Sequence, residues 1–296
     1  MLKTSHVYTA FGLILHSDLE LPELFSAEGQ ADIKIVWGKV PDRLEVPLDQ
    51  SPWWEITTDE YLLRVSGVAS YYAKNGDEII IEPCMNAKAQ DIRVFLLGTV
   101  LPALLSQRDY LVLHGGAVVV NGKAVVFLGP SQVGKTALAL CFYDLGYKLL
   151  GDEVCAIQIR NDKIVAQPGI PQLNAWQDTL AKTGRDFRSY APIRTGLLKY
   201  AVPVCDRFAS VGSELACVIF LRRHNQMTLN YQPIQGGSKF KHLIQHACFD
   251  HALVDRGRFF QMGSAVVQQA SFYEVVFNNI VYPVEKLAGL ILEELG

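Results

Sequence analysis

The sequence has little excess charge of either sign, and its composition gives no sign of a nucleic-acid partner. Its 296 residues include 27 Lys and Arg against 30 Asp and Glu, which leaves a net charge of −3 at pH 7. Binding to nucleic-acid phosphates needs a clustered positive surface. The densest basic pair, Arg222-Arg223, is too short to form one. We therefore expect no nucleic-acid partner.

Paired cysteine motifs and long apolar runs are also missing. The six cysteines show neither a C-x-x-C motif nor zinc-ligand spacing, and most lie in apolar runs, which favours reduced packing residues. No apolar run approaches the ~18 residues that a membrane-spanning helix needs. The first residues lack the features of a signal peptide. We expect a cytoplasmic protein without a membrane partner.

The first third of the chain carries short strand signals and then one helix. Runs such as 61–65 and 78–82 are rich in β-forming residues, and turn signals such as Asn75-Gly76-Asp77 separate them. From Ala87 to Gln107, apolar residues recur at spacings of three and four, as on one face of a buried helix. We expect a small β-rich N-terminal domain with an antiparallel sheet at residues 1–108.

Strand and helix signals alternate over residues 109–296, which predicts an α/β domain. Asn121-Gly122 is a dipeptide of the type that gives the strongest short hairpin signal, and Asn161-Asp162 marks a similar turn. The expected strands are 111–120, 123–128, 154–160, 163–166 and 216–221, and the expected helices are 137–145, 240–248 and 283–295.

One segment of this second domain matches a phosphate-binding motif. Residues 129–136, GPSQVGKT, fit the pattern G-x-x-x-x-G-K-[ST], with an apolar strand before them and a helix-forming stretch after them. Such a loop turns its N–H groups toward phosphates, its lysine reaches the β- and γ-phosphates, and its Ser or Thr hydroxyl is a ligand for Mg²⁺. The expected ATP- and Mg²⁺-binding residues are Gly129, Ser131, Gln132, Val133, Gly134, Lys135 and Thr136.

Two acids follow the motif after one helix. Tyr147 to Gly151 is a short strand that ends in Asp152-Glu153, and this strand can lie beside the strand that leads into the loop. An acid at this place can hold Mg²⁺ or take a proton from an attacking hydroxyl. We expect Asp152 to be catalytic and Glu153 to join Thr136 as a metal ligand. The alternative is an acidic, solvated strand end.

Histidines give weaker signals. His114 precedes Gly115-Gly116, where the backbone can approach a ligand closely, so it is a candidate catalytic residue or a structural hydrogen-bonder. His242 and His246 have the i,i+4 spacing of a metal-binding pair, without an evident third ligand.

Together these motifs resemble the HPr kinase/phosphorylase family, whose catalytic domain is similar to phosphoenolpyruvate carboxykinase. The shared pattern is His114-Gly115, then G-x-S-x-x-G-K-[ST] at 129–136, then Asp152-Glu153. The resemblance implies that Asp152 takes the proton from a substrate serine, with His114 close to it. It also implies that Lys135 and Thr136 bind the triphosphate and its metal, and it leaves a homo-oligomer open because the parent family forms rings.

Further segments are similar to a branch of shorter HPr-kinase-related proteins. These segments are 8–13, Gln167-Pro168-Gly169, Pro171-Gln172-Leu173 and Lys199 before Val202-Pro203. Some proteins of that branch are encoded with lasso-peptide biosynthesis genes and phosphorylate the precursor peptide. Gln132 and Glu153 depart from the parent family's Gly and Asp, and an E-x-R-G-x-G stretch is not found where it is expected. These departures argue against reverse phosphorylase activity and against HPr as the substrate.

The sequence therefore predicts an ATP-dependent serine kinase that acts on a peptide or small protein. Residues 167–176 are expected to form an extended loop because they contain Pro168 and Pro171. In that loop Asn174 and Trp176 are candidate substrate-binding residues, together with Lys199. Three alternatives stay open: a kinase of a small molecule such as free serine, a carboxykinase-like enzyme, and a non-enzymatic ATP-dependent switch.

Overall fold

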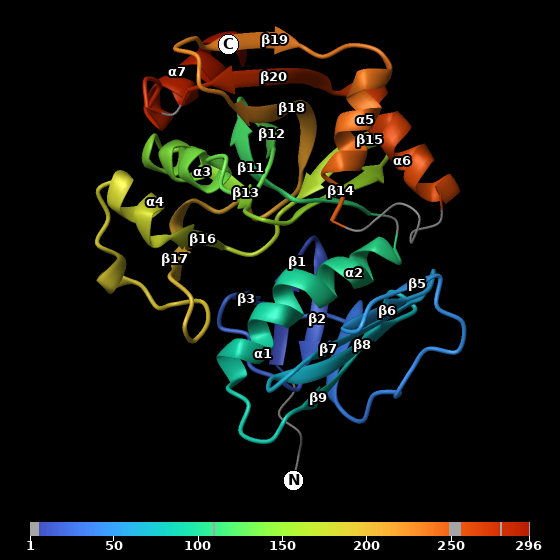
Figure 1. The fold of residues 1–296 in the computed structure, drawn as a ribbon. Coiled ribbons are helices and arrows are strands. Elements are labelled where there is room, and N and C mark those ends of the chain that lie inside the picture. Colours follow the sequence, from blue (N-terminus) through green and yellow to red (C-terminus); the bar gives the residue numbers. More distant parts are fainter. Residues whose placement is uncertain (1–5, 109, 249–255, 279, 296) are drawn as a thin grey trace.

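The structure, a computed structural model, describes residues 6–108, 110–248, 256–278 and 280–295. It is a mixed α/β fold with two nine-stranded sheets and a separate two-stranded sheet (Figure 1).

The strands are β1 (His6–Ala10), β2 (Leu13–Ser17), β3 (Phe25–Ser26), β4 (Ile33–Trp37), β5 (Asp49–Gln50), β6 (Trp54–Ile56), β7 (Glu60–Val65), β8 (Ala69–Lys74), β9 (Glu78–Pro83), β10 (Leu111–Leu113), β11 (Gly115–Val120), β12 (Lys123–Leu128), β13 (Lys148–Gly151), β14 (Cys155–Arg160), β15 (Lys163–Gln167), β16 (Gln172–Trp176), β17 (Lys199–Pro203), β18 (Ser213–Arg223), β19 (Asn230–Pro233) and β20 (Ser271–Phe277). The helices are α1 (Ala89–Phe95), the π-helix η1 (Leu96–Val100), α2 (Leu101–Ser106), α3 (Lys135–Asp144), α4 (Gln177–Lys182), the 3₁₀ turns η2 (Phe187–Ser189) and η3 (Cys205–Arg207), α5 (Gly237–Gln245), α6 (Arg256–Gln269) and α7 (Val284–Leu295).

The N-terminal sheet contains β1 to β9, in the order β3-β1-β2-β4-β9-β8-β7-β6-β5. The expectation of an antiparallel sheet is wrong in part, because β4 runs parallel to both β2 and β9. The reason is the route of the chain. The chain passes through β3, at one edge of the sheet, before it forms β4. It then forms β5 to β8 before it reaches β9. Parallel neighbours need such long connections, whereas hairpins give antiparallel pairs.

One long helix packs on this sheet, over residues 89–106 instead of the expected 87–107. Its central turn is the π-helix η1, which ends two residues before Pro102. A proline has no N–H to donate, so the wider turn lies where the regular hydrogen-bond ladder is already broken. By length and composition the 18-residue helix is apolar enough to cross a membrane, although Asp91 and Arg93 interrupt its apolar run. Half of it is buried inside the protein.

The second sheet is built around three parallel strands, β12, β18 and β20. β11 and β13 extend it beyond β12, β19 extends it beyond β20, and β15, β14 and β10 branch from the start of β18. Helices cover both faces (Figure 1), α3 and α7 on one and α5 and α6 on the other. Side chains of β12 alternate accordingly: Val125 and Phe127 face α3, while Val126 and Leu128 face α6.

The two hairpin turns predicted in the second sheet are confirmed. Asn121 and Gly122 both have positive φ and connect β11 to β12, and Asn161 and Asp162 do the same between β14 and β15. The helix at residues 256–269 was not predicted. The expectation for residues 167–176 is wrong in part, because Gln172–Trp176 is a strand that pairs with β17. Its prolines lie before the paired residues, so they do not interrupt the ladder.

The tip of the β1–β2 hairpin contacts the second sheet. The Phe11 N–H donates to the Pro168 carbonyl at 2.7 Å, and the Tyr110 hydroxyl donates to the Phe11 carbonyl at 3.0 Å. A Cβ at Gly169 would lie 2.9 Å from the Phe11 ring. This contact, which we call the hairpin joint (Phe11, Gly12 and residues 167–169), brings together two segments that the sequence analysis singled out separately.

Candidate functional site

The candidate site lies at one edge of the second sheet. The carboxyl ends of the parallel strands β12, β18 and β20 meet there. β13 ends at the same edge, because β11 lies between β12 and β13 and runs antiparallel to both. Ligands of α/β sheets bind outside the carboxyl ends of the strands. The sequence analysis allowed the strand of the acids to lie beside β12, but β11 separates the two.

Glycine dihedrals shape the loop between β12 and α3. Gly129 has a φ of 147°, and a Cβ there would lie 2.5 Å from the Leu221 carbonyl oxygen, so any larger residue would displace β18. Gly134 has a φ of 119° at the N-cap of α3. Gln132 has a φ of 63°, a left-handed conformation that favours glycine, so the departure from the family pattern falls on a strained position.

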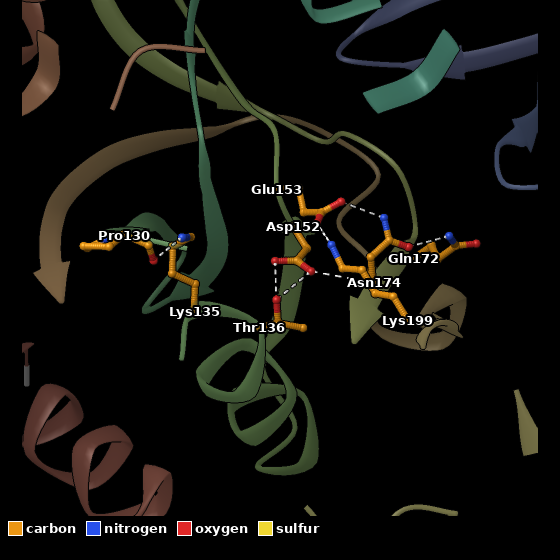
Figure 2. Close-up of polar contacts among 8 residues, drawn as sticks. All are labelled: Pro130, Lys135, Thr136, Asp152, Glu153, Gln172, Asn174 and Lys199. Atoms are coloured by element: carbon orange, nitrogen blue, oxygen red, sulfur yellow. Dashed lines mark hydrogen bonds and ion pairs between the residues drawn. The ribbon is translucent and has the colours of Figure 1, made fainter. Parts of the chain in front are cut away.

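Lys135 is the first residue of α3, directly after the loop, and is 7% exposed. Its ammonium group donates to the Gly129 carbonyl at 2.8 Å. It also donates to the Pro130 carbonyl at 3.1 Å (Figure 2). Burial lowers the pKa of Lys135, and the nearby charges of Asp152 and Glu153 oppose that shift. The Lys135 ammonium thus places a positive charge against the carbonyls of the loop. An anionic ligand can draw this ammonium away from the two carbonyls.

Asp152 faces the first turn of α3. The Thr136 hydroxyl donates to both carboxylate oxygens at 3.2 and 3.1 Å, and the Asn174 backbone N–H donates to one of them at 3.2 Å (Figure 2). Burial, and next the charge of Glu153, raise the pKa of Asp152 to about 7. A carboxylate with such a pKa can accept a proton near neutral pH. The hydrogen bonds place it next to the motif residue that would hold Mg²⁺.

Glu153 is held from three sides. Its carboxylate pairs with Lys199 and accepts a hydrogen bond from the Asn174 side chain at 2.8 Å, while its carbonyl accepts from the Gly115 N–H at 3.2 Å. It has a φ of 66°, which is uncommon for a residue with a side chain. Strained positions of this kind concentrate at functional sites.

The two-stranded sheet supplies the partners of the acids. Asn174 is on β16, and Lys199 is on β17 with its ammonium 5.6 Å from the centre of the Trp176 ring. The Asn174 side-chain oxygen accepts from Gln172 at 2.8 Å. Two of the three predicted substrate-binding residues, Asn174 and Lys199, therefore contact Glu153, and the third, Trp176, lies beside Lys199. The Asn174 amide is already bonded to the acid, which indicates a positioning role.

The three histidines singled out from the sequence have different surroundings, although the His114 backbone N–H donates to the His246 carbonyl at 2.8 Å. His114 lies beside Glu153 at the rim of the cavity, and burial, then the charge of Lys135, lower its pKa. His242 and His246 pack on the Phe220 ring, at centroid distances of 4.5 and 5.6 Å. Within the described ranges, no group of three or more metal-ligand side chains that could hold a metal ion is found.

A cavity of about 550 Å³ connects these groups. A volume of this size is typical of ligand sites. Its lining includes almost every site residue predicted from the sequence: His114, Ser131, Gln132, Val133, Gly134, Lys135, Thr136, Asp152, Glu153, Asn174, Trp176 and Lys199. Gly129 is not part of the lining and acts through the backbone packing described above.

Sequence reasoning missed a second part of the lining. It comes from the end of β18, the end of β20, α4 and the start of α7, and includes Arg223, Phe277, Tyr282 and Pro283. Arg223 was considered only as half of a basic pair too short for nucleic acid. Its position at the end of an apolar strand, two residues after Leu221, was the available signal.

Comparisons with known proteins give little beyond this geometry. No family model and no curated protein matches the chain. Among solved structures, the HPr(Ser) kinase/phosphatase from Coxiella burnetii is similar, with 13% identity and a TM-score of 0.34, over 62% of this chain and 99% of that one. At this level of similarity the interpretation of the site depends on its own residues.

Proposed function

We propose that the protein is an ATP-dependent kinase that phosphorylates a hydroxyl group, most specifically a serine of a peptide or small protein. One observation carries the proposal: Asp152 contacts Thr136 of the phosphate-loop motif and has a pKa raised to about 7. A potential general base therefore lies beside the residue that would hold the metal of a bound nucleotide. Both line a cavity large enough for a nucleoside triphosphate.

The residues present fit ATP and Mg²⁺. The backbone from Gly129 to Gly134, with its left-handed positions, suits an anion-binding loop at the N-terminus of α3. Lys135 would bind the β- and γ-phosphates. Thr136 would hold Mg²⁺, with Asp152 or Glu153 as oxygen ligands. The metal supplies charge neutralisation on the phosphate oxygens.

The chain's own residues would then perform the transfer. Asp152 orients the acceptor hydroxyl and accepts its proton as the hydroxyl oxygen forms a bond to the γ-phosphorus. The bond from that phosphorus to the β–γ bridging oxygen breaks, and ADP leaves. Lys135 and the loop N–H groups stabilise the charge on the phosphoryl oxygens. Asn174 and Thr136 keep the Asp152 carboxylate in place through the hydrogen bonds described above.

The acceptor is the least defined part of the proposal. Asp152, Glu153 and the β16–β17 sheet border the cavity together, so an acceptor reaching Asp152 passes Trp176 and Lys199. An extended peptide suits this border, since the Trp176 indole can pack against one. A lasso-peptide precursor is the acceptor implied by the sequence resemblance. The division of the chain into domains 1–108 and 109–296, and a homo-oligomeric state, are likewise proposals.

A phosphoryl-transfer assay tests the function. The purified chain is given Mg²⁺ and γ-labelled ATP with a serine peptide, with free serine or with no acceptor, beside its Asp152→Asn variant. We expect label on the peptide with the wild type and at least a hundredfold less with the variant. Label on free serine alone would assign a small-molecule kinase. Nucleotide binding without transfer to any acceptor would favour a non-enzymatic switch.

A further inference from the structure

The cavity has a second arm that the phosphoryl chemistry does not use. We define the α7 arm by the lining residues Leu221, Arg223, Phe277, Tyr282, Pro283 and Leu287. Helix α7 and the β16–β17 sheet lie on different sides of α3 (Figure 1), so this arm and the acids flank the loop separately. The α7 arm is mainly apolar and aromatic, although Glu285 belongs to the same lining, whereas the side of the acids is polar and charged.

Arg223 occupies a defined place in the α7 arm. It is the last residue of β18 and pairs with Phe277 of β20 in the parallel register, so the two side chains lie next to each other. Its Nε donates to the Val133 carbonyl of the loop at 3.0 Å. No further hydrogen bond or ion pair is found for its terminal nitrogens within the part of the chain that the structure describes. Arg223 therefore brings a positive, planar group to the junction of loop and arm.

The neighbouring arginine behaves differently. Arg222 points to the other face of β18, and its guanidinium pairs with Glu274 at 2.7 Å. Two adjacent residues of the same type thus have opposite roles in the structure. Arg222 stabilises the sheet surface, while Arg223 lines the cavity.

Tyr282 and Pro283 form the other wall of the arm. The Tyr282 N–H donates to the Asn278 carbonyl at 2.9 Å, which fixes the turn between β20 and α7. The Tyr282 ring packs in part against the core under α3. A planar heteroaromatic ring gains from such surroundings, because aromatic and proline faces stack on it and an arginine can add a cation–π contact.

We propose that the α7 arm binds the base and ribose of the nucleotide, with Arg223 and Tyr282 as base-contacting residues. This inference rests on the proposed function. The reaction requires the γ-phosphate beside Asp152, so the other end of the triphosphate extends away from the acids. The rival place is the exposed surface of α4, where Asp178 and Lys182 pair with each other at 3.8 Å. It offers charged side chains instead of an apolar wall.

Calorimetry with two ligands tests the inference. The wild type is titrated in Mg²⁺ with the β,γ-imido analogue of ATP and with inorganic tripolyphosphate, which has the phosphates but no base. We expect the wild type to bind the ATP analogue at least about tenfold more tightly. In Arg223→Ala and Tyr282→Ala we expect that difference to shrink about tenfold, with tripolyphosphate affinity unchanged. Arg222→Ala is the matched control and should behave as the wild type.

Three results would overturn the inference. Equal wild-type affinity for both ligands would show that the base contributes nothing, and would leave the phosphate site standing. Loss of tripolyphosphate affinity in Arg223→Ala would assign Arg223 to the phosphate site, as a ligand or as the support of the loop at Val133, and not to the base. Selective loss of the ATP analogue in Lys182→Ala, with Arg223→Ala unaffected, would place the base on α4. A wild type that binds neither ligand would contradict the proposed function as well.

Discussion

The two nine-stranded sheets have the same number of strands but different connections and coverings. The N-terminal sheet is mostly antiparallel, is joined largely by tight hairpins, and carries the helix at residues 89–106. The second sheet has the parallel core β12-β18-β20 and helices on both faces. Parallel strands need long connections, which in the second sheet contain helices, and each connection leaves a loop at the carboxyl edge.

This difference explains where the candidate chemistry lies. The loop after β12, Arg223 at the end of β18 and Phe277 at the end of β20 all reach one edge of the second sheet. Hairpin turns such as Asn75-Gly76 reverse the chain directly and leave no long loop at the carboxyl end of a strand. The candidate site therefore lies on the second sheet, and the N-terminal sheet supports that site.

The largest effect is expected from Lys135→Ala. Removing this ammonium should abolish detectable binding and turnover of Mg·ATP, because it provides the point charge for the phosphates. The far-ultraviolet circular dichroism spectrum should stay that of the wild type. Lys163→Ala is a suitable control, since Lys163 is an exposed lysine of the same sheet that pairs with Glu214 at 2.8 Å. Wild-type affinity in Lys135→Ala, measured by calorimetry, would contradict the assignment of the loop.

The next effect concerns Asp152→Asn. Phosphoryl transfer should fall by roughly 10²–10⁴, the usual contribution of a general base, while the variant still binds ATP. Steady-state kinetics and calorimetry on one preparation separate the two quantities. If Asp152 acts as a metal ligand instead, Mn²⁺ or raised Mg²⁺ should restore part of the activity. Near-normal turnover in the variant would contradict both roles.

A pH profile should show the raised pKa of Asp152. The base must be deprotonated to act, so kcat/KM should fall about tenfold per pH unit below about 7. The folded protein also binds this proton more tightly than the unfolded chain. Stability from this group is therefore greatest in acid and declines as pH rises toward 7. Asp152→Asn should remove that decline in urea titrations, and an unchanged slope would contradict the assignment.

The smallest effect on activity is expected from the N-terminal sheet. Phe11 is 1% exposed, so Phe11→Ala should cost about 3–5 kcal/mol of stability by leaving a cavity at the hairpin joint. We expect kcat to fall a few-fold with unchanged ATP affinity, because Gly169, which contacts Phe11, also donates to the Leu150 carbonyl two residues before Asp152. Trp53 is a 60% exposed aromatic residue of the N-terminal region, and Trp53→Ala should change neither the stability nor kcat. A lowered ATP affinity in Phe11→Ala would show that the joint supports the loop instead.

The sequence predicted the local features well. The turns at Asn121-Gly122 and Asn161-Asp162 have direct chemical causes in residues that tolerate positive φ, and the motif from Gly129 to Thr136 has fixed spacing. The prediction that the acids lie close to the loop agrees with the Thr136–Asp152 hydrogen bonds, although the intervening strand β11 was not foreseen.

The long-range features could not be read from local patterns. The parallel pairing of β4 depends on where the chain returns after visiting both sheet edges. The pairing of β16 with β17 joins segments separated by α4, and it alone brings Lys199 to Glu153. Arg223 becomes a cavity residue through the register of β18 and β20, which no spacing in the sequence specifies.

The hairpin joint also constrains the order of folding. Phe11 and Pro168 are far apart in the chain, so their hydrogen bond closes a long loop and forms late relative to local hairpins. Until it forms, residues 167–169 lack their support, and with them the strand end that carries Asp152. The strand end that carries Asp152 is therefore held in place only when the N-terminal hairpin and residues 167–169 have met.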